Sequence, residues 1–147
     1  MAVHPRKTIR EKIVSILSAG GVVPSAGGRI YDSRVQVVET APFVIVRVVS
    51  DEPEEPFIGL SIPTYNRVLT VEIDVVDTER PSSGTLAGNA DDVAREVEIA
   101  LQGNITLDNL ALSCLLQNTI LEESGEVDPP AYLVQLIYQV RYEDTVS

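Results

Sequence analysis

The segment RVLTVEIDVVD, residues 67–77, decides the fold. Two sets of residues alternate along it: Leu69, Val71, Ile73 and Val75 on the one hand, and Thr70, Glu72, Asp74 and Val76 on the other. Successive side chains of a strand point to opposite faces of a sheet. The period of two therefore predicts a strand that buries the first set and turns most of the second set toward solvent or a partner.

The segments before this strand also predict extended structure. Residues 43–49 form a β-branched run whose only charge is Arg47, which is typical of a central strand. Residues 29–38 are expected to be extended, with a bend near Asp32 and Ser33.

Two further strands are predicted toward the C-terminus. Residues 110–121 form one of them, and an acidic turn over residues 122–130 follows it. Residues 131–142 form the other, and residues 143–147 are expected to fray as a flexible tail. The last strand alternates clearly, with an apolar set that comprises Tyr132, Val134, Leu136, Tyr138, Val140 and Tyr142.

The N-terminal segment predicts an amphipathic helix. Its apolar residues Ile9, Ile13, Ile16 and Leu17 recur at the spacing of one helix face. Pro5 suits the first turn, His4 caps or precedes the helix, and Gly20-Gly21 ends it.

A second helix is predicted after the central strand. Asn89 is expected to be its N-cap, with Asp91 and Asp92 in the first turn, where the helix dipole favours acids. Gly103-Asn104 ends it. The apolar stripe consists of Ala90, Val93, Ala94, Val97 and Leu101.

This order of elements predicts an α+β fold in a single domain of 147 residues. We expect a mainly antiparallel sheet of about five strands, with both helices on one face.

Residues 50–66, SDEPEEPFIGLSIPTYN, are expected to form a long β-hairpin arm between two antiparallel strands. We call this segment the arm. The residues proposed for protein contact are the acids Glu52, Glu54 and Glu55 and the apolar residues Phe57, Ile58 and Leu60. Acids around an apolar centre suit an interface with a polar rim, although a loop without a partner would carry the same residues. Glu72 and Asp74, on one face of the central strand, are further candidates for protein contact.

The composition excludes several classes of function. The net charge of −11, from 22 acidic and 11 basic residues, leaves no basic footprint for nucleic acid. No apolar run approaches the roughly 18 residues that span a bilayer, so no membrane is expected as a partner. Such acidity suits docking onto a basic protein surface.

No catalytic or metal-binding motif is visible, so we expect neither enzyme activity nor a cofactor. With one His and one Cys, an ordinary zinc site is not available, and Cys114 is expected to be a buried apolar residue. The carboxylate pairs Glu72/Asp74 and Asp91/Asp92 leave open a small carboxylate-based enzyme or a ligand-binding domain. Mg²⁺ bridging between the acids of neighbouring subunits also stays open.

Several pieces of the chain, in order, resemble the tail terminator proteins of long-tailed bacteriophages, the minor tail protein U group. They are Ala19-Gly20-Gly21 after a helix, RIYDS at 29–33, Ala41-Pro42 before a strand, RVLTVEI at 67–73, DDVAREVE at 91–98 and two closing strands. The resemblance spans nearly the whole chain, and the arm is the part that matches least.

The resemblance implies a structural protein without enzymatic activity. Such proteins form a hexameric ring on the last ring of tail-tube protein, stop its polymerisation and present a surface to the head–tail connector. They act in the bacterial host cytoplasm and then in the virion tail. Another head–tail connector or completion protein is the alternative within the same class.

Overall fold

The computed structural model describes residues 3–33, 41–54, 64–78, 86–124 and 131–145. Its elements are α1 (Pro5–Ser18), a 3₁₀ turn η1 (Pro24–Ala26), β1 (Ile30–Asp32), β2 (Phe43–Pro53), β3 (Thr64–Thr78), α2 (Leu86–Gln102), β4 (Ser113–Ser124) and β5 (Ala131–Thr145).

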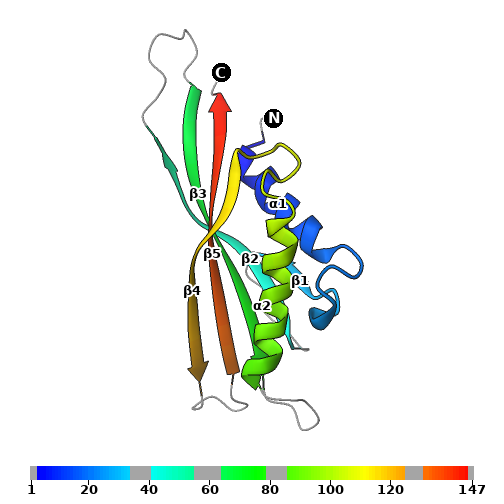
Figure 1. Cartoon of the computed structure of the whole chain (residues 1–147). Coiled ribbons are helices and arrows are strands. Elements are labelled where there is room, and N and C mark those ends of the chain that lie inside the picture. Colours follow the sequence, from blue (N-terminus) through cyan, green and yellow to red (C-terminus); the bar gives the residue numbers. More distant parts are fainter. Residues whose placement is uncertain (1–2, 34–40, 55–63, 79–85, 125–130, 146–147) are drawn as a thin grey trace.

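The strands form one sheet in the order β1-β2-β3-β5-β4. β1 runs parallel to β2, and the other neighbouring pairs are antiparallel. Both helices lie on the same side of the sheet (Figure 1). The predicted α+β class, the mainly antiparallel sheet of five strands and the placement of both helices are therefore confirmed.

The alternation along β3 builds the core as predicted. Its residues Leu69, Val71, Ile73 and Val75 are fully buried. They lie opposite Val140, Tyr138, Leu136 and Val134 of β5 in the sheet register. α1 covers β1 and β2 with Ile9, Ile13 and Leu17, and α2 covers β3 and β5 with its predicted stripe. Each fully buried aliphatic side chain contributes about 1.5–3 kcal/mol relative to an exposed one, so this shared face holds the layers together.

The start of α1 is also confirmed. Nδ1 of His4 accepts a hydrogen bond from the backbone N–H of Arg6, at 3.1 Å, and Pro5 occupies the first turn. The cap satisfies one of the donors that a helix N-terminus leaves without an intrahelical partner.

The predicted start of α2 is wrong. The helix begins at Leu86, so Asn89 lies inside it and Asp91 and Asp92 come after the first turn. Helix formation through Gly88 costs about 1 kcal/mol relative to alanine, which the burial of Ala90 and the residues after it offsets.

The bounds of the last two strands also differ from the expected ones. The chain turns just before β4, where Leu107, Asp108 and Asn109 have positive φ angles, so β4 begins only at Ser113. β4 then continues through Glu122 and Glu123, so the acidic turn predicted from residue 122 is wrong there. β5 continues to Thr145, into the segment expected to fray, and residues 143–145 pair with residues 64–66.

The arm is shorter than predicted at its base. β2 continues to Pro53 and β3 begins at Thr64, so residues 50–53 and 64–66 belong to the sheet. Proline is tolerated at this position because β1 pairs only with residues 44–46, which leaves the rest of β2 as a free edge. Residues 55–63 lie outside the described residues.

Candidate interaction surface

Of the six residues of the arm that were predicted to contact a protein, the structure describes Glu52 and Glu54. Glu52 is exposed near the end of β2. The carboxylate of Glu54 accepts a hydrogen bond from Nη1 of Arg141 on β5, at 2.7 Å, and the Glu54 N–H donates to the Asn66 carbonyl. Because this ion pair is exposed, it contributes less than about 1 kcal/mol and leaves Glu54 available to a partner. The predicted residues Glu55, Phe57, Ile58 and Leu60 lie outside the described residues.

A buried polar network at the base of the arm was missed by the sequence analysis. The Tyr142 hydroxyl donates to Oδ2 of Asp51 at 2.7 Å, and the guanidinium of Arg6 contacts the same oxygen at 3.1 Å. Arg67 lies 3.7 Å from that oxygen and 3.1 Å from Asp144. Asp51 also belongs to the acidic arm segment, but its side chain is buried. The network ties β2, β3, β5 and α1 together where the arm leaves the sheet.

Glu72 and Asp74 lie together on the sheet face opposite the helices. Arg47 of β2 forms ion pairs with both of them, and the distance from its Nε to the Asp74 carboxylate is 3.3 Å. Glu72 is half-buried, whereas Asp74 is only 8% exposed. The pair lies on the predicted face of the strand, but Asp74 is buried there rather than turned to solvent.

The burial of Asp74 has an electrostatic consequence. The pKa of its carboxyl is raised to about 6, first by loss of hydration and then by the nearby Glu72, while Arg47 and a hydrogen bond from Gln135 lower it in part. A carboxyl of this kind titrates near neutral pH, but its neighbours are an arginine, an acid and an amide. This arrangement suits an ion pair within a protein surface.

Among the described residues, the largest group of exposed aliphatic side chains on one element belongs to β4, at the edge of the sheet. Leu121 is 59% exposed, and Leu115, Leu116 and Ile120 are also exposed. Leu116 and Leu121 lie opposite Tyr138 and Val134 of β5, whereas Leu115 and Ile120 lie opposite Gln139 and Gln135. The free side of β4 carries no charge or proline from residue 113 to residue 121. β4 also has a register shift between Leu116 and Asn118, which interrupts its pairing with β5. Apart from this shift, an apolar edge strand without charges is a template for pairing with another chain. Sequence patterning alone does not find this surface, because its residues resemble those of a core strand.

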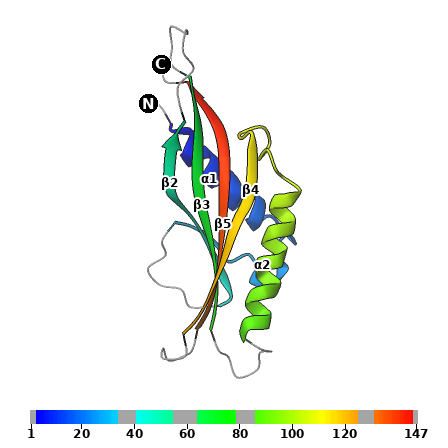
Figure 2. The ribbon, with the colours of Figure 1, turned by 60° about the vertical axis from the view of Figure 1, so that its left-hand side comes forward.

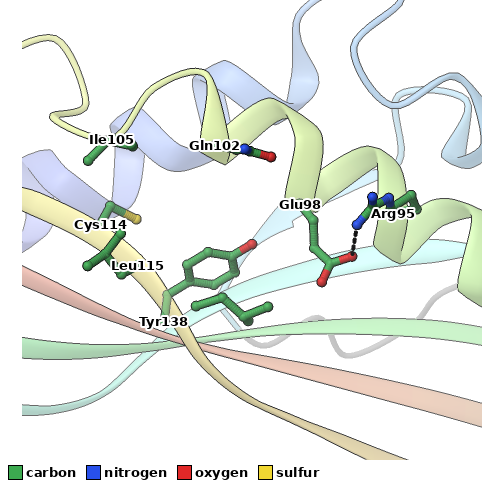
Figure 3. A pocket seen from close by; sticks show the side chains of 8 residues that line it. Arg95, Glu98, Gln102, Ile105, Cys114, Leu115 and Tyr138 are labelled. Carbon is green, nitrogen blue, oxygen red and sulfur yellow. Dashed lines mark ion pairs between the residues drawn. The ribbon is translucent and has the colours of Figure 1, made fainter.

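A groove separates β4 from α2 (Figure 3). It encloses about 260 Å³. Its lining combines apolar side chains of β4 with a polar rim from α2, and consists of Arg95, Glu98, Gln102, Ile105, Cys114, Leu115, Leu116 and Tyr138. We call this groove together with the exposed residues of β4 the β4 surface. An apolar floor with a charged rim is the usual anatomy of a protein-binding surface.

The groove offers little chemistry for catalysis. Burial raises the pKa of the Cys114 thiol to about 12, so at neutral pH it is protonated and a poor nucleophile. Burial, and then the charge of Glu98, also raise the pKa of Tyr138 above its usual range. Arg95 and Glu98, three positions apart on α2, form an ion pair at 3.7 Å at the rim of the groove. Cys114 is buried, as the sequence predicts.

The opposite edge of the sheet is protected. β1 is three residues long, and the free half of β2 carries a bulge at Val49 and ends in Asp51, Glu52 and Pro53. Bulges, acids and proline all discourage the addition of another strand. Figure 2 shows β2 and β4 on opposite sides of the sheet, with α1 behind the strands. α1 also packs against α2.

Charge is distributed unevenly between these two sides. α1 carries four basic residues and one acidic residue, a net charge of +3 in a chain of net charge −11. α2 carries four acids and one arginine, and β4 carries two acids, so together they have a net charge of −5. Arg6 and Lys7 of α1 are ion-paired with Asp51 and Glu11. With the acids of β1 and β2 included, α1, β1 and β2 together have a net charge of +1.

Among the described residues, no three His, Cys, Asp or Glu side chains are grouped so that they could hold a metal ion. None of the helices in this part of the chain is long and apolar enough to cross a bilayer.

No protein-family model matches the chain, and no curated protein matches it. Among solved structures, the fold is similar to that of a chain in the virion of a native gene transfer agent particle, with a TM-score of 0.68 and 13% sequence identity. The match covers 97% of this chain and 100% of the other. At this identity, the likeness shows that the two chains share one fold over their whole length.

Proposed function

We propose that this chain is a structural protein of a phage or prophage virion that caps the tail tube as a ring. The full-length match to a chain of a gene transfer agent virion, a phage-like particle, is the observation that carries the proposal. The resemblance to the tail terminators narrows the role to ending tube polymerisation and preparing the tube for the head–tail connector.

The surface of the molecule supports a role in assembly. The β4 surface leaves four large aliphatic side chains of one strand exposed, which a protein that acts alone has no reason to retain. Its contacts would be with other copies of the chain, the tail tube protein or the connector. The groove, with its protonated thiol and phenol, favours a non-enzymatic role.

The charge of the chain fits a channel for DNA. A lumen lined by acids repels the phosphate backbone, so DNA would pass without being retained. In this role the protein works in the host cytoplasm during assembly and afterwards in the virion tail.

Sedimentation with purified tail tubes tests the capping role. A cap occupies tube ends only, so the amount of bound protein should saturate at a fixed number of copies per tube, whatever the tube length. Binding in proportion to tube length, or no binding, would contradict capping. Binding to the head portal instead of the tube would favour the alternative, another head–tail connector or completion protein.

The arm gives a second test. Charge reversal of Glu52 and Glu54, which are exposed at its base, should weaken attachment to the tube or to the neighbouring copy. The matched control reverses Asp91 and Asp92, which are exposed on α2. Equal attachment of both variants and the unchanged protein would exclude a role for Glu52 and Glu54.

A further inference from the structure

The second half of β4 is an unpaired edge with a regular register. The shift between Leu116 and Asn118 comes before it, and every residue from Asn118 to Ser124 then has its own partner on β5. On the other side, none of the described strands pairs with β4, which is last in the sheet order. We call residues 118–124 the β4 edge. Its length suits the addition of one more strand, since strands are usually about 5–6 residues long.

The side chains of the β4 edge include two adjacent pairs, one aliphatic and one acidic. Ile120 and Leu121 are exposed, and Glu122 and Glu123, which follow them, are exposed as well. Leu121 and Glu123 lie on the face toward the helices, whereas Ile120 and Glu122 lie on the opposite face. Because side chains alternate along a strand, each face of the edge thus presents one aliphatic and one acidic side chain.

The two acids of the edge leave negative charge without a matching base. Within the part of the chain that the structure describes, no lysine or arginine forms an ion pair with Glu122 or Glu123. Burial, and then the charges of Asp91 and Glu123, raise the pKa of Tyr132 on β5, so an acid of α2 adds to the negative field at this end of the strand. A strand that carries bases opposite these acids would be attracted, and an acidic strand would be repelled.

We infer that the β4 edge receives an extended segment of a different protein, in which two basic residues are followed directly by two aliphatic residues. We expect antiparallel pairing, which is the arrangement of β4 with β5 and gives the more stable ladder. The partner strand then runs in reverse, so its bases lie opposite Glu123 and Glu122 and its aliphatic residues opposite Leu121 and Ile120. The inference rests on the assembly role proposed above and names the chemistry of one partner.

A second copy of this chain does not contain such a segment. Its only adjacent basic residues are Arg6 and Lys7, which lie in α1 and are flanked by Pro5 and Thr8. No aliphatic pair therefore adjoins them in either direction of the chain. The β4 edge of a second copy would bring acids in place of bases. The segment that fits the edge must come from another protein.

Peptide binding tests the proposed chemistry. The probe is a fluorescent peptide of sequence Thr-Lys-Arg-Val-Ile-Thr, and in the control peptide two glutamates replace Lys and Arg. Fluorescence anisotropy with the full chain should show at least about tenfold tighter binding of the basic peptide, since like charges directly opposite each other destabilise a strand pair.

A charge swap on the protein provides the matched test. The variant with Glu122→Lys and Glu123→Lys should prefer the acidic peptide over the basic one. The control variant carries Glu11→Lys and Asp92→Lys, which change the net charge equally but lie on α1 and α2, and it should retain the original preference. All four side chains are exposed, so both variants should fold, which circular dichroism will check.

Methylation of the peptide backbone tests whether the contact is a strand pairing. Along an added strand, alternate amide groups point toward β4 and the others point to solvent. Two basic peptides are therefore made, each with N-methyl groups on one alternate set of amides. One of them should bind at least about tenfold more weakly than the unmodified peptide, and the other should bind nearly as well. Equal binding of the two would exclude strand addition.

Other results would also overturn the inference. They are failure of the basic peptide to bind, equal binding of the basic and acidic peptides, and an unchanged preference in the variant with Glu122→Lys and Glu123→Lys. Self-assembly of the unchanged chain that this variant abolishes, measured by light scattering, would show that a second copy occupies the edge. Tubes capped by a chain that binds no peptide would overturn this inference alone, whereas peptide binding with uncapped tubes would overturn only the proposed function.

Discussion

Replacing Tyr142 with phenylalanine removes one hydroxyl from the base of the arm and leaves the buried ring in place. The Tyr142 side chain is fully buried, and its hydroxyl donates to the Asp51 carboxylate at 2.7 Å. A hydrogen bond to a charged group contributes about 1.5–3 kcal/mol, and Phe fills the same space, so no cavity adds to the cost. We therefore expect Tyr142→Phe to lower the free energy of unfolding by about 1.5–3 kcal/mol.

This loss is large enough to measure by two methods. For a domain of this size, 1 kcal/mol corresponds to about 2–4 °C, so the thermal midpoint should fall by about 3–12 °C. Urea denaturation should show a lower midpoint with an unchanged m-value, because the surface exposed on unfolding stays the same.

Tyr138→Phe is the matched control. Tyr138 lies on the same strand and is buried to a similar degree, but its side chain lines the groove, and its hydroxyl bonds to none of the described residues. Its replacement should change stability by less than about 0.5 kcal/mol, as expected where no special contact is lost. Equal losses for the two variants would refute the assignment of the energy to the Asp51 contact.

Four further predictions follow from the described residues. Burial raises the pKa of Asp74 to about 6, so the folded state binds more protons than the unfolded state between about pH 4 and 6 and loses stability as the pH rises through that window. Asp74→Asn removes this pH dependence, so the free energy of unfolding of the variant, relative to that of the unchanged protein, should rise by roughly 1–3 kcal/mol between pH 4 and pH 7 in urea denaturation. A difference that stays constant with pH would contradict burial of Asp74 as the cause. Cys114 should react with a thiol reagent only slowly in the folded protein and rapidly in denaturant, whereas a fast native reaction would show that the thiol is accessible. Ile13→Ala should cost about 2–5 kcal/mol in the same denaturation assay, because Ile13 is fully buried between α1 and the sheet, and a cost below 1 kcal/mol would argue against this packing. Mg²⁺ should raise the mass measured by light scattering of chelator-treated protein if it bridges acids between copies, and an unchanged mass would exclude such bridging.

The parts of the fold that were predictable depend on local periodicity. Alternation in β3 places Leu69, Val71 and Ile73 on one face of the strand, and helical spacing places Ile9 and Ile13 on one face of α1. Such apolar faces are stable only when another element covers them, and all five residues are buried. The start of α2 was not predictable in this way, because Asn89 is a good local cap and only the packing of the helix on the sheet extends it to Leu86.

The candidate surfaces depend on contacts between distant residues. Asp51 and Tyr142 are 91 positions apart, and they meet only because β2, β3 and β5 pair in one particular register. Leu116 and Leu121 have the sequence of core residues, and their exposure follows from the place of β4 at the edge of the sheet, where α2 leaves them uncovered. Sequence patterning shows which side chains are apolar, and the strand order decides which of them remain exposed.

The length of tail tubes assembled in the presence of this protein tests the central claim most directly. Tail-tube protein should be polymerised with and without the chain, and tube lengths should be measured by electron microscopy. The account predicts that growth stops early, with shorter tubes that carry a density at one end. Tubes of equal length and bare ends in all samples would contradict the claim that this protein ends tube polymerisation.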